Sequence, residues 1–283
     1  MKNIRVTNGT FVAEGGAPYL VMLLFKKDVG YGLCGGTIID PTTIITAGHC
    51  VYNRATSRTA SPTDAYVFYG SVSAQNRNYA QATQIILHPK YNPRNYANDI
   101  AILKIPALAM APGKVETINF YDGSLSPKQA FQVYGWGTTR TGDSSSTANS
   151  LLTQTVYVSN PSDCQVIESN YKDADGPQIC ANNHYNIGVD VCQGDSGTGT
   201  TVFSNKTPYY SGLVSYGTNA AGDATCGEDG SFGMYTNVYY YKSWIESATG
   251  LKYMSGPNSI PVTTTSPPEP KPTSCFLFFF FCG

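Results

Sequence analysis

Residues 18 to 240 are dominated by short runs of apolar and β-branched residues, each four to eight residues long, with turn-forming residues between them. No helix-rich stretch separates these runs, so the pattern predicts an antiparallel sandwich or barrel and not a parallel sheet. The predicted strands are Tyr19–Phe25, Gly36–Ile39, Thr43–Thr46, Ala65–Tyr69, Thr83–Leu87, Ile100–Lys104, Ala130–Tyr134, Thr153–Val158, Thr200–Phe203, Tyr209–Tyr216 and Gly233–Val238. One helix is predicted after them, at Tyr239–Thr249. Its apolar positions at helical spacing, before Gly250, are Tyr240, Trp244, Ile245 and Ala248.

The charge balance narrows the classes of function. Only 13 % of the residues are charged, against roughly 25 % in typical domains, and the formal net charge is −1. Such a chain has no electrostatic footprint for nucleic acid or for an anionic membrane surface. No segment approaches the roughly 20 apolar residues that a transmembrane helix needs. We therefore expect neither nucleic acid among the partners nor a segment that spans a membrane.

The cysteines point to an oxidising compartment. Eight cysteines are dispersed along the chain without any C-x-x-C pair, and only three histidines are present, so zinc-finger spacing is absent. An even, dispersed set is typical of disulfides, although the spacing leaves the pairing open. The sequons that start at Asn8 and Asn205 agree with an extracellular, secreted protein. Residues 1–5 are too short for a signal peptide, and we expect the export signal to lie outside this chain.

The composition changes at Ser255. The stretch Pro257–Thr273 is rich in Pro, Thr and Ser, which predicts an extended linker. It leads to the Phe-rich segment Cys275–Gly283, whose six consecutive apolar residues are too few to cross a bilayer. Three interpretations of this tail stay open: a truncated or wrongly predicted C-terminus, a docking plug, or an anchor to a membrane surface.

Three short motifs carry the chemistry. The segment Cys192–Gly197 places Ser196 between two glycines and directly after an acid, which is the local chemistry of a nucleophilic serine. Glycines let backbone N–H groups turn toward a substrate carbonyl. Upstream lie Thr46–Cys50, which contains His49, and Asn98–Leu103, which contains Asp99. The order His, Asp, Ser has gaps of 50 and 97 residues.

These motifs resemble those of the chymotrypsin/trypsin family of serine endopeptidases, in its trypsin-like branch, from about Val6 to Thr249. The resemblance implies an all-β fold of two packed six-stranded antiparallel β-barrels with a C-terminal helix. The expected organisation is a short pro-segment remnant at residues 1–5, a peptidase domain at 6–254, and the linker and tail at 255–283. His49 and Asp99 would come from the first barrel and Ser196 from the second, with the cleft between them.

The resemblance also assigns roles. Ser196 would be the nucleophile, His49 its general base, and Asp99 the group that holds the imidazole in the correct tautomer. The N–H groups of Gly194 and Ser196 would form the oxyanion hole. The other two histidines are weaker candidates for the general base, because His88 fits a surface turn and His184 fits a polar loop. Asp99 could merely start a strand, and Ser196 could lie in a glycine-rich turn.

A specificity pocket for Arg or Lys is implied by Asp190, which lies where trypsin-like relatives carry the acid at the pocket base. Gly217 and Gly233 would leave the walls open, and Ser215-Tyr216-Gly217 would pair with the substrate backbone, with Tyr216 as an aromatic wall. Val191 lacks the hydroxyl that many relatives place there, so a guanidinium should be preferred over an ammonium. A surface position for Asp190, which would leave a chymotrypsin-like pocket, is the competing interpretation.

The N-terminal region resembles a zymogen junction. Cleavage between Arg5 and Val6 would free an α-amine that pairs with Asp195 and orders the loop. The disulfide pairs that the resemblance implies are Cys34–Cys50, Cys164–Cys180 and Cys192–Cys226, and Cys275 and Cys282 have no counterpart.

Two departures bear on activity and ions. Thr198 stands where relatives usually have glycine, which could strain the loop. Residues 65–98 contain no acid, so a calcium loop is not expected, and no cofactor or metal is predicted.

The expected partners are protein or peptide substrates and protein protease inhibitors, with the chain a monomer. The competing function is a secreted, catalytically impaired protease homologue that acts as a binding protein.

Overall fold

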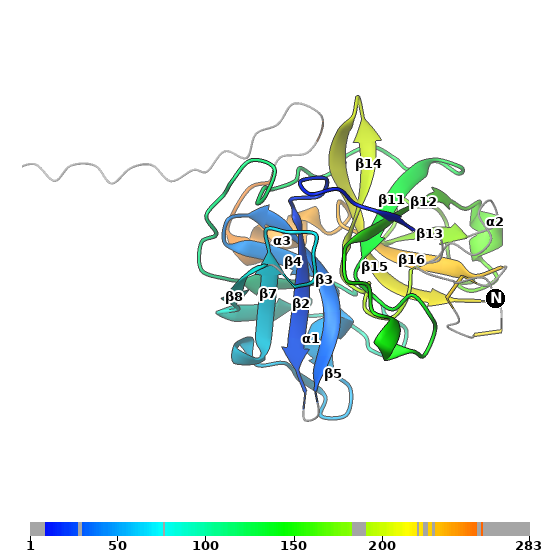
Figure 1. The fold of residues 1–283 in the computed structure, drawn as a ribbon. Coiled ribbons are helices and arrows are strands. Elements are labelled where there is room, and N and C mark those ends of the chain that lie inside the picture. Colours follow the sequence, from blue (N-terminus) through cyan, green and yellow to red (C-terminus); the bar gives the residue numbers. More distant parts are fainter. Residues whose placement is uncertain are drawn as a thin grey trace, which may run out of the picture.

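The computed structural model describes residues 9–27, 30–75, 77–182, 191–219, 221–222, 226–227, 230–253 and 256. The fold is mostly β, as expected, and two antiparallel sheets lie side by side with few helices around them (Figure 1). The short helices outside the sheets are α1 (Gly48–Val51), α2 (Pro161–Cys164) and α3 (Lys242–Thr249), with 3-10 turns at Pro62–Asp64 and Ser144–Ser146. None of the described helices is long and apolar enough to cross a membrane.

The C-terminal sheet closes into a six-stranded barrel. Its order is β12-β11-β14-β15-β16-β13, and pairing of β12 with β13 completes the ring, while the short N-terminal strand β1 adds to β12 from outside. The strands are β1 (Thr10–Phe11), β11 (Ala130–Gly135), β12 (Leu152–Val158), β13 (Gln178–Asn182), β14 (Gly199–Ser204), β15 (Thr207–Thr218) and β16 (Phe232–Asn237).

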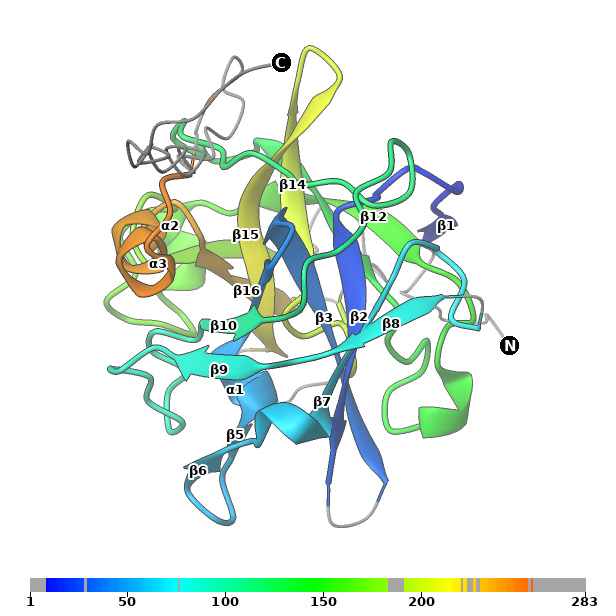
Figure 2. The ribbon, with the colours of Figure 1, turned by 90° about the vertical axis from the view of Figure 1, so that its left-hand side faces the viewer.

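The N-terminal sheet is a curled half-barrel in the order β8-β7-β2-β3-β4-β10-β9. Its strands are β2 (Leu20–Lys26), β3 (Tyr31–Asp40), β4 (Thr43–Thr46), β7 (Ala65–Tyr69), β8 (Asn78–Gln81), β9 (Gln84–Leu87) and β10 (Ala101–Lys104), with a separate pair β5 (Tyr52–Asn53) and β6 (Arg58–Thr59). The sheet curls because β8 and β9 are consecutive pieces of one stretch, which pairs first with β7 and then with β10 (Figure 2).

The continuous apolar runs of the sequence reflect strands that are buried on both faces. On β2, Val21 and Leu23 point into the half-barrel, whereas Leu20 and Met22 belong to a second cluster that lies between the sheets. The same division holds along β10, where Ala101 and Leu103 belong to the cluster inside the half-barrel and Ile102 belongs to the cluster between the sheets. This middle cluster also contains Tyr210 and Leu213 of the C-terminal barrel, so apolar burial holds the two sheets together.

All the predicted strands are confirmed, but several strands were not predicted. β8 is a polar, mostly exposed edge strand, and β13 is short and flanked by polar residues. Neither segment carries the apolar run on which the sequence argument relied.

The C-terminal helix is confirmed, but one of its apolar positions was wrong. α3 runs from Lys242 to Thr249, and the residue after it, Gly250, has the left-handed φ of 72° that favours glycine. Tyr240 is 55 % exposed, whereas Tyr241 is only 4 % exposed. Helical spacing does not apply to Tyr240, because it lies in a turn before the helix. Asn237 Oδ1 accepts the N–H groups of Tyr239 and Tyr240 in that turn.

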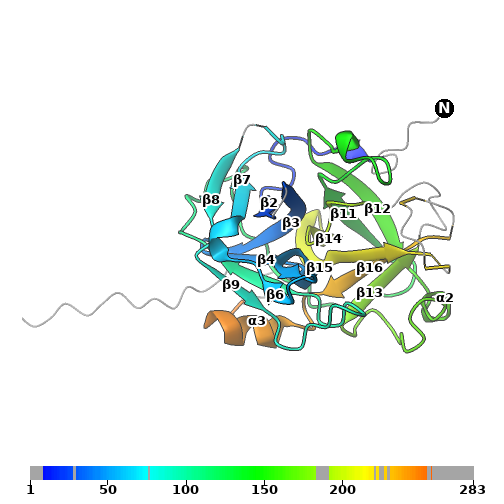
Figure 3. The same ribbon diagram turned by 90° about the horizontal axis from the view of Figure 1, so that it is seen from below.

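His88 is buried and does not lie on the surface as predicted. Its ring centroid is 4.7 Å from that of Trp244 and 5.4 Å from that of Tyr241, where α3 packs beside β9 (Figure 3). Its Nδ1 accepts the Lys90 N–H at 3.2 Å, which requires that nitrogen to be unprotonated. Burial, with a smaller contribution from the charge of Lys90, holds the pKa of His88 below its usual value.

This environment predicts a stability that depends on pH. The unfolded chain takes up a proton at His88 as the pH falls through about 6.5, and the folded chain resists it until a lower pH. The free energy of unfolding should therefore decrease as the pH drops from about 7.5 to about 5. The variant His88→Phe keeps an aromatic ring and should lose less stability over this range, as measured by urea unfolding. Parallel pH profiles for the two proteins would contradict the assignment.

Candidate active site

The antiparallel pairing of β4 with β10 brings His49 and Asp99 together. Ala101 pairs with Thr46, so the start of β10 lies beside the end of β4, and the helix α1 that carries His49 follows directly. His49 Nδ1 lies 2.8 Å from Asp99 Oδ2, and the His49 backbone N–H donates to Asp99 Oδ1 at 2.8 Å. Two residues 50 positions apart thus form a pair. When the neutral His49 ring donates from Nδ1 to Asp99, its other nitrogen, Nε2, is the hydrogen-bond acceptor.

Asp99 is 1 % exposed and its carboxylate has donors from both sheets. Besides the two bonds from His49, the Ser215 hydroxyl of β15 donates to Asp99 Oδ2 at 2.5 Å. The Thr236 hydroxyl of β16 donates to the Asp99 backbone carbonyl at 2.9 Å. A buried carboxylate needs such donors, because desolvation would otherwise favour its neutral form. Ser215 was predicted only as part of the substrate strand, and its distance of 116 residues from Asp99 hides this contact in the sequence.

Ser196 lies where the two sheets meet. Its carbonyl accepts the Gly35 N–H of β3 at 2.7 Å, and the next residue, Gly197, donates its N–H to Val214 of β15 at 2.7 Å. Gly197 has a φ of 78°, and a Cβ there would lie 2.3 Å from Thr46 Oγ1. Only glycine fits this position, so the local sequence around Ser196 is set by the close approach of both sheets.

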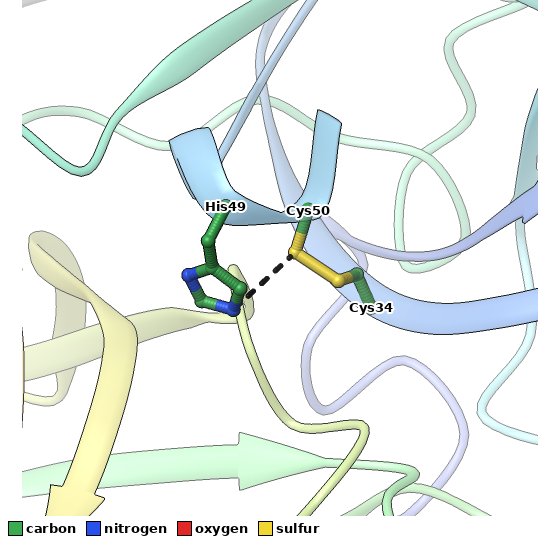
Figure 4. Close-up of side chains that lie close together, drawn as sticks. All are labelled: Cys34, His49 and Cys50. Atoms are coloured by element: carbon green, nitrogen blue, oxygen red, sulfur yellow. Dashed lines mark hydrogen bonds between the residues drawn. A yellow bond between two sulfur atoms is a disulfide. The ribbon is translucent and has the colours of Figure 1, made fainter. Parts of the chain in front are cut away.

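His49 and Ser196 line the same open groove, which has a volume of about 560 Å³. No hydrogen bond joins the Ser196 hydroxyl to the His49 ring in the described part of the chain. Instead His49 Nε2 faces the neighbouring disulfide, 4.0 Å from Cys50 Sγ (Figure 4). The contact between a nucleophile and its base is often long before substrate binds. That Ser196 and His49 line the same groove is therefore the observation that bears on their roles.

The described cysteines form three disulfides, Cys34–Cys50, Cys164–Cys180 and Cys192–Cys226. These are the pairs that the resemblance implies. The first joins α1 to β3 directly beside His49. Cys34, His49 and Cys50 lie close enough to suggest a metal site, but the two sulfurs are bonded to each other and offer no thiolate.

Asp195 is fully buried beneath the Ser196 loop. Its Oδ1 accepts the Gly137 N–H at 2.7 Å and its Oδ2 accepts the Cys192 N–H at 2.8 Å. A Cβ at Gly135 would lie 1.7 Å from Asp195 Oδ1, so glycine at that position leaves room for the carboxylate. Its predicted partner Val6 lies outside the described residues.

The predicted specificity pocket is only partly described, since Asp190 lies outside the described residues, as does His184. Val191 is buried at the groove, and Tyr216 and Gly217 also line it. Gly233 pairs with Gly217 but does not line the groove. A Cβ at Gly233 would lie 2.5 Å from the Tyr235 hydroxyl, so its missing side chain accommodates that tyrosine.

An aromatic wall of the groove was not predicted in full. The Tyr96 ring stacks on Tyr216 at 4.9 Å and meets the His49 ring edge-on at 5.5 Å. The Arg54 guanidinium lies 4.8 Å from the Tyr96 ring centroid, a cation–π arrangement. Tyr96 has a φ of 55°, which is uncommon for an aromatic residue and which no sequence pattern indicates.

Thr198 fits its loop because Gly35 faces it. Thr198 is fully buried and is not among the described residues with a positive φ, so the strain considered from the sequence does not arise. A Cβ at Gly35 would lie 1.9 Å from Thr198 Oγ1 and 2.8 Å from its Cα. The missing side chain on β3 thus provides the space that the threonine occupies.

Comparison with known proteins agrees with this architecture. The family model described as Trypsin matches residues 6–245. Trypsin-3 of Salmo salar is 30 % identical over 218 residues, which cover 77 % of this chain and 83 % of that protein. Serine protease 1 of Homo sapiens and Trypsin of Xenopus laevis are each 28 % identical over 243 residues, which cover 86 % of this chain and 89 % and 90 % of those proteins. The chain belongs to the trypsin family and is a serine protease of that family.

The fit between Gly35 and Thr198 predicts a strong effect of one methyl group. Gly35→Ala should destabilise the protein by about 1–3 kcal/mol or more, because Thr198 crowds the new Cβ. Combining it with Thr198→Gly should restore part of this loss, since two of the three closest atoms are then removed. Gly176→Ala is the control, because its nearest atom would be 3.7 Å away and little change is expected. Denaturant unfolding of the wild type, of Gly35→Ala and Thr198→Gly singly, and of the double variant measures the coupling, and additive losses would contradict it.

Proposed function

We propose that this serine protease is an endopeptidase that hydrolyses peptide bonds after Arg, and less efficiently after Lys, through an acyl-enzyme. The observation that carries the proposal is that His49, which is paired with the buried Asp99, lines the same groove as Ser196. In the proposed first step Ser196 Oγ attacks the substrate carbonyl carbon while its proton passes to His49 Nε2. The new C–O bond forms as the carbonyl π electrons move to oxygen, which gives a tetrahedral oxyanion.

The proposed oxyanion donors are the N–H groups of Gly194 and Ser196. Neither donates a hydrogen bond within the described part of the chain, and Gly194 has a φ of 100° that only glycine adopts readily. Loss of one such donor typically lowers the rate by about 10²–10³-fold. The C–N bond then breaks, and the amine leaves with the proton held on His49. Water repeats the sequence on the ester and releases Ser196.

An extended peptide would bind along the edge of β15. β14 pairs with β15 only as far as Leu213, so residues 216–218 have a described strand partner, β16, on one side only. A substrate backbone can add there as a further strand, which favours peptides over small metabolites. Tyr96 and Tyr216 would then flank the substrate residues next to His49.

Regulation and location are parts of the same proposal. We infer that the chain is a zymogen cleaved between Arg5 and Val6, and that the new α-amine pairs with Asp195. The support is the full burial of the Asp195 carboxylate directly beneath the Ser196 loop, because a cation placed beside a buried carboxylate offsets its loss of hydration. Disulfides support an extracellular location. The impaired-homologue alternative is not favoured, because His49, Asp99 and Ser196 are all present and Thr198 is accommodated.

Kinetics on variants test the reaction. Ser196→Ala should lower kcat by at least about 10⁴-fold on an Arg substrate and abolish both the burst with an Arg ester and labelling by an organophosphonate. Ser126→Ala, at an exposed serine, is the control and should retain all three. The chain that begins at Val6 should be faster than the chain that keeps residues 1–5. Equal rates would remove the zymogen part alone, whereas activity in Ser196→Ala would remove the nucleophile assignment.

Matched peptides test the specificity. Arg should exceed Lys in kcat/KM by several-fold, because the guanidinium fork can pair with both oxygens of Asp190 while Val191 provides no hydroxyl for an ammonium. The variant Val191→Ser should narrow this ratio without changing the preference for a cation. A Phe peptide should be a poor substrate. Equal values for Arg and Lys, or a preference for Phe, would contradict the proposed pocket.

A further inference from the structure

The tip of the hairpin formed by β14 and β15 carries a sequence motif that the proteolytic site does not use. Ser204 pairs with Thr207, so the loop consists of Asn205 and Lys206 alone. Their φ values are 49° and 68°, the pattern of a type I′ turn, in which asparagine is well accepted. The hairpin projects from the body of the molecule in two perpendicular views (Figures 1 and 2).

The residues of the tip present every group that N-glycosylation needs. Asn205-Lys206-Thr207 has the form Asn-x-Thr without proline, and all three residues are exposed. In the described part of the chain neither the Asn205 carboxamide nor the Thr207 hydroxyl makes a hydrogen bond, so both are available to an enzyme. The turn geometry explains an asparagine at this position, but it does not require a threonine two residues later.

Phe203 exposes apolar surface beside the tip of the hairpin. It is 50 % exposed, pairs with Pro208 across the hairpin, and precedes Asn205 by two residues. None of residues 203–208 lines the groove that contains His49. We propose that Asn205 carries an N-linked glycan whose first sugars cover the apolar surface at Phe203. The proposal rests on the export part of the proposed function and on no step of the proteolysis.

The modification is a group transfer from a polyisoprenyl-diphosphate-linked oligosaccharide, catalysed by the transferase of the host's secretory pathway. The Asn205 Nδ2 forms a bond to C1 of the first sugar. The bond between C1 and the diphosphate oxygen breaks, and the lipid diphosphate leaves with that electron pair. The amide proton passes to a base of the transferase, so no oxidant or reductant is needed.

The test uses the full chain behind an appended secretion signal in eukaryotic cells, in the Ser196→Ala background so that proteolysis does not interfere. Peptide mapping before and after peptide-N-glycosidase should place a glycan on the Asn205 peptide, resolved from the peptide that contains the sequon at Asn8. Asn205→Gln and Thr207→Ala should each lose that glycan, and Thr207→Ser should keep it. Asn160-Pro161-Ser162 is an internal control that proline should leave unmodified. An unmodified Asn205 peptide from secreted, disulfide-bonded protein would overturn the proposal.

Covering of Phe203 has its own readout. Enzymatic removal of the glycan should increase the fluorescence of a dye that binds exposed apolar surface. Deglycosylation should have little effect on dye binding in the variant Phe203→Ser, which still carries the sequon. The same increase with and without Phe203 would overturn the covering role and leave the site itself standing.

Discussion

The hydrogen bonding of the buried Asp99 carboxylate is the interaction on which the candidate site depends. An ionised carboxylate removed from water without partners is unfavourable by several kcal/mol. Here the donors come from His49, which follows β4 of the N-terminal sheet, and from Ser215 on β15 of the C-terminal barrel. Satisfying this one charge therefore requires the two sheets to dock. The same bonds orient the imidazole, so docking of the sheets and orientation of the ring are coupled.

Apolar burial provides the free energy for that docking. The middle cluster draws on the second faces of β2, β4 and β10 and on Tyr210 and Leu213 of the opposite barrel. Strands buried on both faces cannot show the alternation of polar and apolar residues that marks a half-exposed strand. This explains why the sequence contains continuous apolar runs, and why those runs were easily recognised as strands.

What the sequence could predict follows from the range of each interaction. Strands with apolar runs, the helix that ends before Gly250, and the motifs around His49, Asp99 and Ser196 are local features. The exposed edge strand β8 lacks an apolar run, and the burial of His88 depends on α3, more than 150 positions away. The Ser215–Asp99 bond and the Arg54–Tyr96 contact join segments whose separate sequences say nothing about each other. Tertiary contacts decided these points, and a one-dimensional pattern does not contain them.

The pairing of Gly35 with Thr198 shows how a departure from a family motif should be judged. Considered alone, a β-branched residue two positions after Ser196 suggests a strained loop. Considered with its neighbour, it fills a volume that a glycine on the facing sheet leaves free, while the backbone bond from Gly35 N–H to the Ser196 carbonyl is kept. The geometry of the Ser196 loop is set by contacts to both sheets, so its tolerance for a residue depends on the opposite wall. A single position in such a motif is therefore weak evidence about activity unless the residue that packs against it is known.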